Sequence, residues 1–456
     1  MLGCIGSFHG TFEVLSTHSV VVPETDDDNG PERYSSNVEY KALHEVKIVK
    51  RDAARADSEG NVRLLLIMFA SYFTFGIILN VVGVMIPILI KQYHLSLFWG
   101  GMLPFALFMP FGVCSIPAGL VADRLGPKPV VFSGMLLMAI GCGAIPWATG
   151  FLSIMILAFI IGSGVALLET AGNPLIERLD KQENYHRNLT LTIGFCGIGA
   201  FAGPFCLSAL LSYGQPWQQL YTDYAVLCVI LLILLVISEF PAGESAAAEK
   251  IRPSEIVKLL RHPIAVTYFV AVFFYIGAEV GTASWIVKFF QQVHGLGVDR
   301  AVSGSQNLFL RYLPALPVLT VSLFWGLQGF GRLTSGLGIR YLGPRLMLRL
   351  YAFGAICSLL IAIFGSVYIS AVGFAACGFF TSVLITLLFS GAINTFIEFR
   401  GTLSGLLVSA SIGGGIIPPL VGLTADHVGI RTAMMVPLLC FLYVLGIAVV
   451  GKAKYE

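Results

Sequence analysis

The amino-acid sequence predicts an all-α membrane protein with twelve transmembrane helices, and its composition and apolar runs carry that prediction. Of the 456 residues, 56% are hydrophobic and only 12% are charged, whereas soluble proteins usually contain about 25% charged residues. Apolar runs of about 20 residues recur along the chain, which is the length a helix needs to cross a hydrocarbon layer about 30 Å thick. Because these runs are continuous and do not alternate, they indicate helices and exclude a β-barrel.

The remaining composition narrows the partners that we expect. The chain contains 50 glycines, and such small residues allow close helix packing in lipid. It has nine cysteines without any metal-binding or redox spacing, since the closest pair is Cys196 and Cys206. We therefore expect no metal ion and no cofactor. The net charge of +2 gives no sign of a nucleic-acid partner, and we expect none. The partners that we expect are the lipid bilayer and a small solute, and we expect the protein to be a monomer.

The polar and apolar segments divide the chain into five parts. Residues 1–62 are polar and of mixed charge, which predicts a solvated tail. The most polar link, residues 241–263, separates two six-helix bundles at 63–240 and 264–451, and residues 452–456 form the C-terminus. The twelve predicted spans are 63–91, 97–122, 129–148, 151–176, 189–213, 221–240, 264–290, 312–338, 346–366, 368–395, 403–425 and 432–451.

The distribution of Lys and Arg predicts the orientation. One set of loops contains most of these residues, while the loops on the other side contain only Lys91, Arg300, Arg311 and Arg431. Basic residues concentrate in cytoplasmic loops. Both termini and the link 241–263 are therefore expected in the cytoplasm, in a plasma or inner membrane.

A short sequence recurs at the ends of three spans. GLVADRLGPKP (119–129) follows the second span, GLGIRYLGPRL (336–346) follows the eighth, and GLTADHVG (422–429) follows the eleventh on the opposite membrane face. Internal repeats of this kind are typical of secondary transporters, whose two halves rock around a central site.

The first copy resembles the loop signature of the major facilitator superfamily, G-x-x-x-D-R-x-G-x-[RK]. The matching residues are Gly119, Asp123, Arg124, Gly126 and Lys128. The resemblance implies the twelve-helix fold of that family and a loop that latches neighbouring helices in one conformer. Arg340 takes the place of Asp123 in the second copy, so the two predicted latches differ chemically.

The fourth span ends in ALLETAGNP (166–174), which resembles the L-E-T-A-x-N-P motif of the fucose–galactose–gluconate symporter branch. SIPAGL (115–120) and FFYIGAEVGTASW (273–285) also resemble segments of that branch. The resemblance implies that Glu169 lies in a central cavity, takes part in sugar binding and proton movement, and is accompanied by Asn173. The residues alone also favour function, because an ionisable group inside a span faces a cavity or a partner. The alternative is a structural ion pair with Arg187 or Arg332.

Three further residues are candidates for substrate contact. Glu279 is ionisable inside the seventh span, and Asn80 is polar inside the first. Trp285 follows Glu279 by six residues and would offer an aromatic face to a sugar, although a tryptophan near a membrane boundary is often an interfacial anchor.

The chain also departs from the related branch at two places. Gly83 stands where the branch carries a proton-coupling aspartate, and the segment 193–196 reads IGFC where the branch reads Q-x-F-N. The first difference predicts weak proton coupling or facilitated diffusion, and the second implies that two polar sugar contacts of the branch are absent.

We therefore expect a secondary transporter that moves a small polar solute, preferably a monosaccharide, by alternating access. An exporter of drugs or lipophilic cations that bind Glu169 and Glu279 is one alternative. A non-transporting membrane sensor is another. No enzymatic activity is expected, because we find no nucleophile elbow, phosphate loop or metal spacing outside the spans.

Overall fold

A computed structural model of the chain describes residues 61–179, 185–238, 240, 258–297 and 315–450. The predicted tail 1–62 therefore lies almost wholly outside the described residues, as do most of the link 241–263 and the C-terminus 452–456.

The first six spans follow the predicted positions closely. They comprise a helical segment at 61–80 that passes a turn at Val81 into α2 (Val82–Tyr93), then α3 (Leu97–Leu125), α4 (Pro127–Ala144) with η1 (Ile145–Trp147), α5 (Phe151–Arg178), α6 (Tyr185–Ser212) and α7 (Gln218–Val236). The boundaries differ from the predicted ones by a few residues in either direction, since apolar runs do not define the exact ends of helices.

The last six spans include three that are interrupted, of which the last has a turn at Met434. The seventh, eighth and ninth spans are α9 (Pro263–His294), α11 (Leu316–Leu342) and α12 (Pro344–Phe364), and the tenth is α13 (Val367–Thr381) with α14 (Leu384–Thr395). The short helix η2 (Ile397–Phe399) leads into the eleventh span, which is α15 (Arg400–Ser409), η3 (Ala410–Ile412) and α16 (Gly413–Val428). The twelfth span is α17 (Ile430–Ala433) with α18 (Met435–Val450). The tenth span is interrupted at residues 382–383, and the eleventh tightens into 3₁₀ geometry at η3.

The predicted all-α membrane fold is confirmed. Within the described residues, eleven helices are long and apolar enough to cross a membrane. The further long helix α11, at Leu316–Leu342, occupies the place of the predicted eighth span. Together these helices account for the twelve predicted spans, and the protein is a multi-pass membrane protein.

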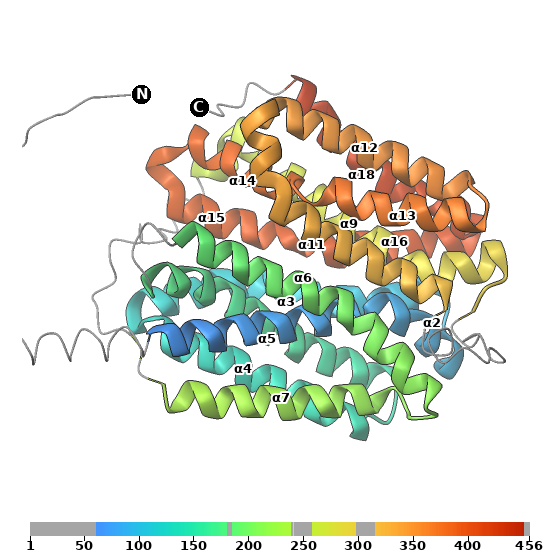
Figure 1. Ribbon diagram of the computed structural model, residues 1–456, viewed down its shortest axis with the longest axis horizontal. Helices are drawn as coiled ribbons and strands as arrows, with labels where there is room; N and C mark the ends of the chain where they lie inside the picture. The colour runs from blue at the N-terminus through green and yellow to red at the C-terminus, as the bar shows by residue number, and fades with distance from the viewer. Residues whose placement is uncertain (1–60, 180–184, 239, 241–257, 298–314, 451–456) are drawn as a thin grey trace, which may run out of the picture. The chain divides into compact units, whose positions relative to one another are not determined.

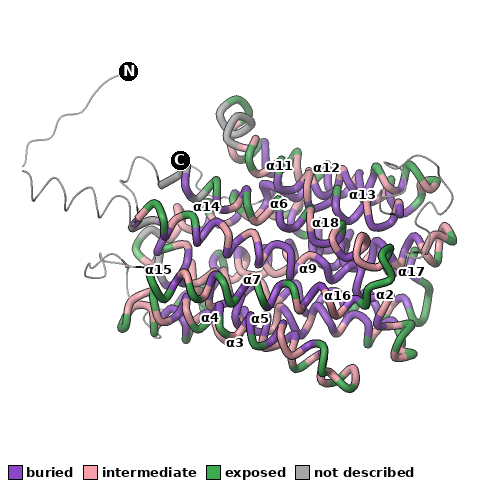
Figure 2. Tube along the Cα trace, turned by 60° about the horizontal axis from the view of Figure 1, so that its bottom comes forward, coloured by how far each residue is buried: buried purple, intermediate pink, exposed green. Residues whose placement is uncertain are grey.

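The helices of residues 61–236 form a first half of the bundle, those of residues 263–450 form a second half, and the two halves lie beside one another. Figure 1 shows the first half in blue to light green and the second in yellow to red. In the first half α5 contacts both α3 and α4, and in the second half α13 contacts both α11 and α12. Figure 2 shows buried residues running along the inward faces of the helices, while exposed ones gather on the outer faces and at the ends.

The two halves meet along seams of close backbone contact, formed by α3 with α16, α6 with α11, and α2 with α9. Glycines make these contacts possible. A Cβ atom on Gly101 of α3 would lie 2.7 Å from the carbonyl oxygen of Pro418, and one on Gly83 of α2 would lie 2.6 Å from that of Ala283. Both separations are too short for a side chain, so the backbones approach as small residues allow in lipid.

The two ends of the helical bundle contain different helix connections. The end at which α3 passes into α4 contains Arg124 and Lys128, and we call it the basic end. The end at which α2 passes into α3 is called the opposite end. In Figure 1, α15 lies toward the basic end at the left and α2 toward the opposite end at the right.

Candidate functional site

A buried ion pair lies in the middle of the second half. Arg332 Nη2 of α11 lies 3.5 Å from Glu279 Oε1 of α9, and the two side chains are 27% and 7% exposed respectively. A single buried charge in a membrane span is costly, and a partner of opposite charge reduces that cost. Each of the two charges therefore lowers the free-energy cost of placing the other inside the membrane.

The break in the tenth span lies against the same ion pair. Where α13 ends, its last carbonyl groups have no helical partner. The Tyr275 hydroxyl donates to the Thr381 carbonyl at 2.9 Å, and Arg332 Nε donates to the Ser382 carbonyl at 3.4 Å. A guanidinium at this position also faces the negative end of the α13 dipole. The broken helix and the buried arginine thus stabilise each other, as is required of irregular backbone at membrane depth.

Glu169 connects this cluster to the first half. It is half-buried on α5 and interacts electrostatically with Arg332. Cys196 of α6 also interacts electrostatically with Arg332, Glu169 and Glu279. One guanidinium therefore pairs with the carboxylate of Glu279 and attracts that of Glu169 from the other half, and the three groups carry one negative charge in excess when all are ionised. The ion pair considered between Glu169 and Arg332 is not formed among the described residues, where Arg332 pairs with Glu279 instead, and the side chain of Arg187 lies outside the described residues.

Asn173, one turn beyond Glu169, is held within the first half. The hydroxyl of Tyr72, from the helical segment 61–80, donates to Asn173 Oδ1 at 2.7 Å. This bond fixes α5 against the first span next to Glu169. Asn173 thereby positions the helix that carries the carboxylate.

A small space lies between the two halves. The first, second, seventh and eighth spans line it with Leu79, Asn80, Val82, Gly83, Phe108, Val280, Ala283, Ser284 and Trp325. Its polar groups come from Asn80 and Ser284, and its aromatic rings from Phe108 and Trp325. Asn80 Nδ2 also donates to the Gly76 carbonyl at 2.7 Å. The predicted residue Asn80 therefore lies at an interface where a solute would contact both halves.

Trp285 lies elsewhere and does not line this space. Its side chain is fully buried, and its indole N–H donates to the Pro418 carbonyl at 3.0 Å. Six residues on a helix correspond to a rotation of about 240° from Glu279, so Trp285 faces α16 and not the side that Glu279 occupies. The aromatic residue predicted for sugar contact is in this conformer a packing residue, and Trp325 lines the inter-half space instead.

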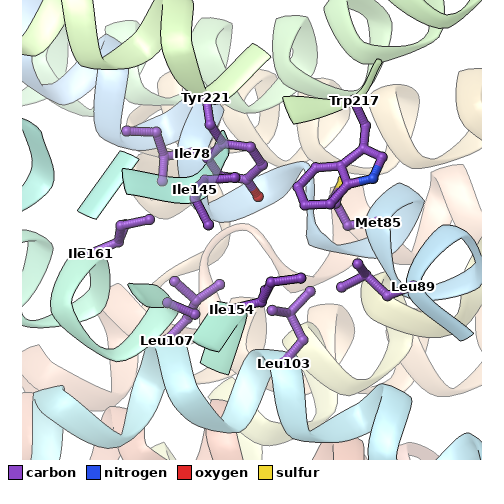
Figure 3. Close-up of a pocket in the computed structure, with 11 residues that line it drawn as sticks. Ile78, Met85, Leu89, Leu103, Leu107, Ile145, Ile154, Ile161, Trp217 and Tyr221 are labelled. Carbon is purple, nitrogen blue, oxygen red and sulfur yellow. The ribbon is translucent and has the colours of Figure 1, made fainter. Parts of the chain in front are cut away.

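A second space of about 320 Å³ lies within the first half and is almost wholly apolar. Figure 3 shows its lining, in which aliphatic side chains such as Ile78 and Leu103 surround the rings of Trp217 and Tyr221. The Trp217 indole N–H is already bonded to Gln92 Oε1 at 2.9 Å. This space therefore offers little to a polar solute.

The predicted latch residues lie where α3 passes into α4. Gly126 has a φ of 82° at this turn, a conformation that glycine adopts without steric cost. Lys128 Nζ lies 5.0 Å from the centre of the Phe240 ring, and Arg124 is exposed. Asp123 is half-buried and forms no hydrogen bond or ion pair within the described part of the chain. Gly119 is buried in α3, while the side chain of Arg340 lies outside the described residues.

The sequence interpretation missed several polar groups near the cluster. Arg332 was considered only as an ion-pair partner of Glu169. An arginine inside a span is, however, as costly as a glutamate and equally indicates a functional position. Among the described residues, the buried atoms Thr282 Oγ1, Gln328 Nε2 and Ser382 Oγ have no hydrogen-bond partner. Thr282 lies about one helical turn from Glu279, Gln328 lies about one turn from Arg332, and Ser382 lies at the α13 break. Buried polar atoms of this kind usually bind water or a ligand.

Comparison with known proteins identifies the fold. The family model of the Major Facilitator Superfamily matches residues 64–417. The chain belongs to the major facilitator superfamily. The resemblance drawn from the loop signature is thereby confirmed.

Relatives within this family cover most of the chain. A glucose/galactose transporter of Brucella abortus is 28% identical over 398 residues, which are 84% of this chain and 92% of that protein. An L-fucose-proton symporter of Escherichia coli is 24% identical over 420 residues, 84% of this chain and 92% of that protein. A crystal structure of the Escherichia coli fucose:proton symporter FucP matches with a TM-score of 0.59 at 22% identity, covering 87% of this chain and 100% of that one.

The buried ion pair generates a prediction about stability. Arg332→Gln leaves Glu279 buried without its counter-charge. We expect a loss of about 3 kcal/mol, the low end for a broken buried pair, because Arg332 is partly exposed. Thermal unfolding in detergent should show a lower Tm, and adding Glu279→Gln should restore most of it.

Arg349→Gln is the matched control, because Arg349 Nε bonds the Ala448 carbonyl and no carboxylate. Its effect should not be rescued by Glu279→Gln. If Arg332→Gln and Glu279→Gln have additive effects on Tm, the two charges do not stabilise each other.

Proposed function

We propose that the protein is a secondary transporter that carries a monosaccharide across the membrane by alternating access between its two halves. The observation that carries the proposal is the inter-half space beside Asn80, Ser284 and Trp325, together with the charged cluster that joins Glu169 to the second half. Solute sites in transporters lie at the interface of the repeats, near the middle of the membrane. The names of the relatives, which include a glucose/galactose transporter and a fucose-proton symporter, support a sugar.

The chemistry of the lining favours a sugar over an apolar drug. Sugars combine hydroxyl groups, which need donors and acceptors, with C–H faces that stack on aromatic rings. Asn80 and Ser284 supply the first, and Phe108 and Trp325 supply the second.

Each charged residue has a role in this proposal. Glu169 accepts hydrogen bonds from sugar hydroxyls and is the acidic anchor contributed by the first half. Arg332 holds Glu279 and the α13 break in place and draws Glu169 toward the second half. The unpartnered polar atoms of Thr282, Gln328 and Ser382 bind water or the solute as it passes.

We also propose the orientation of the protein in the membrane. The basic end faces the cytoplasm, because Lys and Arg concentrate there. The opposite end then faces outward, and both termini are cytoplasmic.

The first test removes the charge of Glu169. Glu169→Gln keeps the size of the side chain but loses a charge-assisted hydrogen bond worth roughly 1.5–3 kcal/mol. Uptake of radiolabelled monosaccharides into proteoliposomes should fall roughly ten- to hundredfold. Asp223→Asn is the control, because that exposed carboxylate bonds Gln219 of its own helix at 2.8 Å.

The same assay separates the alternatives. Normal uptake by Glu169→Gln would remove this residue from the site. Sugar binding without flux in the wild type would indicate a sensor. Flux of lipophilic cations without flux of sugars would indicate an exporter.

A second test distinguishes the two tryptophans. Trp325→Leu removes an aromatic face from the inter-half space, and the half-saturating sugar concentration should rise roughly three- to tenfold. Trp285→Phe removes the bond to Pro418 but no lining group, so Tm should fall while half-saturation is unchanged. The opposite pattern would restore Trp285 as the sugar-stacking residue.

A third test concerns proton coupling. Gly83 holds no acid, and the close Ala283 carbonyl leaves no room for one. Glu279 is held by Arg332, whereas Glu169 has no ion-pair partner among the side chains that the structure describes. We expect facilitated diffusion or weak coupling. Proteoliposomes with an imposed pH gradient should show counterflow but little net accumulation.

Accumulation well above equilibrium that a protonophore abolishes would contradict this expectation. In that case Glu279→Gln in the same assay tests whether Glu279 is the coupling acid. Gly83→Asp should not create coupling, because its side chain would separate α2 from α9.

A further inference from the structure

The third copy of the repeated sequence, GLTADHVG, forms a contact that the proposed function does not use. Asp426, near the end of α16 in the second half, accepts two hydrogen bonds from the start of α3 in the first half. The Leu97 amide donates to Oδ1 at 2.8 Å and the Phe98 amide donates to Oδ2 at 2.9 Å. These are the first two amides of α3, which have no acceptor within their own helix.

The contact is favourable for two physical reasons. Acidic side chains are among the preferred caps of a helix N-terminus, since they satisfy its free amides. The negative charge also faces the positive end of the helix dipole. Unlike an ordinary cap, however, this carboxylate belongs to the other half of the protein.

The surrounding backbone is closely packed at the same end. A Cβ atom on Gly422 would collide with the Leu97 carbonyl oxygen, and one on Gly101 would lie 2.7 Å from the Pro418 carbonyl oxygen. The α3–α16 seam is therefore closed around Asp426. The two hydrogen bonds can form only while this seam stays closed.

At the basic end, the aspartate related to Asp426 makes no such contact among the described residues in this conformer. Asp123 occupies in the first copy the place that Asp426 occupies in the third, since each follows the sequence GL-x-A. The nearby helix α15 begins at Arg400, and no side chain caps it at Phe399. Asp123 itself has no hydrogen-bond partner among the described residues. One of the two related aspartates is thus engaged and the other is not.

We propose that Asp426 is a conformational latch that holds the opposite end closed. Opening that end separates α16 from α3 and breaks both hydrogen bonds, so the free energy of the cap favours the conformer seen here. The latch resets the transporter after solute release and sets how often the opposite end opens. The proposal rests on alternating access but not on the identity of the solute.

The test measures the opening of this end without any solute. Spin labels attached to non-natural amino acids at Trp147 and Tyr368 report the separation of the halves and leave the native cysteines in place. Both positions are highly exposed at the opposite end, one in each half, at 79% and 76%. Electron–electron resonance distances in nanodiscs then give the ratio of open to closed molecules.

Asp426→Asn should raise the open-to-closed ratio roughly fivefold, because one of the two acceptor oxygens becomes an NH2 donor that faces an α3 amide, and the negative charge is lost. Asp426→Ala, which has no acceptor, should raise it at least as far. Two control variants each remove a polar side chain whose printed hydrogen bond stays within one helix, so that no contact between the halves is lost. Ser96→Ala deletes a cap that accepts from the Trp99 amide of the same helix at 3.5 Å. Asp223→Asn deletes another exposed carboxylate near the same end.

An increase confined to the two Asp426 variants supports the latch. Three results would overturn it: an unchanged ratio in both Asp426 variants, an equal increase in Ser96→Ala or Asp223→Asn, or an equal increase in Asp123→Asn. Because no sugar is added, failure of the latch and failure of the sugar assignment are distinguishable.

Discussion

The site depends on the placement of one guanidinium inside the membrane. Arg332 pairs with Glu279, donates to the free Ser382 carbonyl and attracts Glu169 across the interface. Without it, Glu279 would be buried without a counter-charge, Glu169 would lose its attraction to the second half, and the carbonyl at the end of the broken helix would lose a donor. A neutral side chain of the same length would satisfy at most one of these groups. The charged cluster is therefore a single unit, and its members cannot be interpreted separately.

Glycines determine where the two halves touch, and thereby which chemistry the interface excludes. At Gly83 the backbone of α9 lies so close that the position has no space for a side chain. The absence of an acid there is therefore a consequence of packing as well as of sequence. The same constraint at Gly101 and Gly422 seals the opposite end. Close backbone contact also makes these seams sensitive to small movements, because packed interfaces do not deform continuously.

Much of the architecture could be predicted from the sequence, whereas the detailed contacts could not. Continuous apolar runs located each helix to within a few residues, and an ionisable residue inside a span drew attention to Glu169 and Glu279. Helical periodicity alone did not reveal the neighbour of Trp285, because the face it occupies depends on how α9 packs against α16. The partner of Glu279 was equally hidden, since Arg332 is 53 positions away along the chain. Only the packing of α9 against α11 brings them together.

The three copies of the repeated sequence show how one motif acquires different roles. In the first copy the acid is Asp123, in the second the related position is Arg340, and in the third it is Asp426. The structure engages only Asp426 with a helix N-terminus of the other half, among the residues that it describes. A helix N-terminus attracts an acid and repels an arginine, so Arg340 cannot act as an N-terminal cap of this kind. The copies therefore differ chemically at the two ends of the protein, and among the described residues only the opposite end has a carboxylate that joins the two halves.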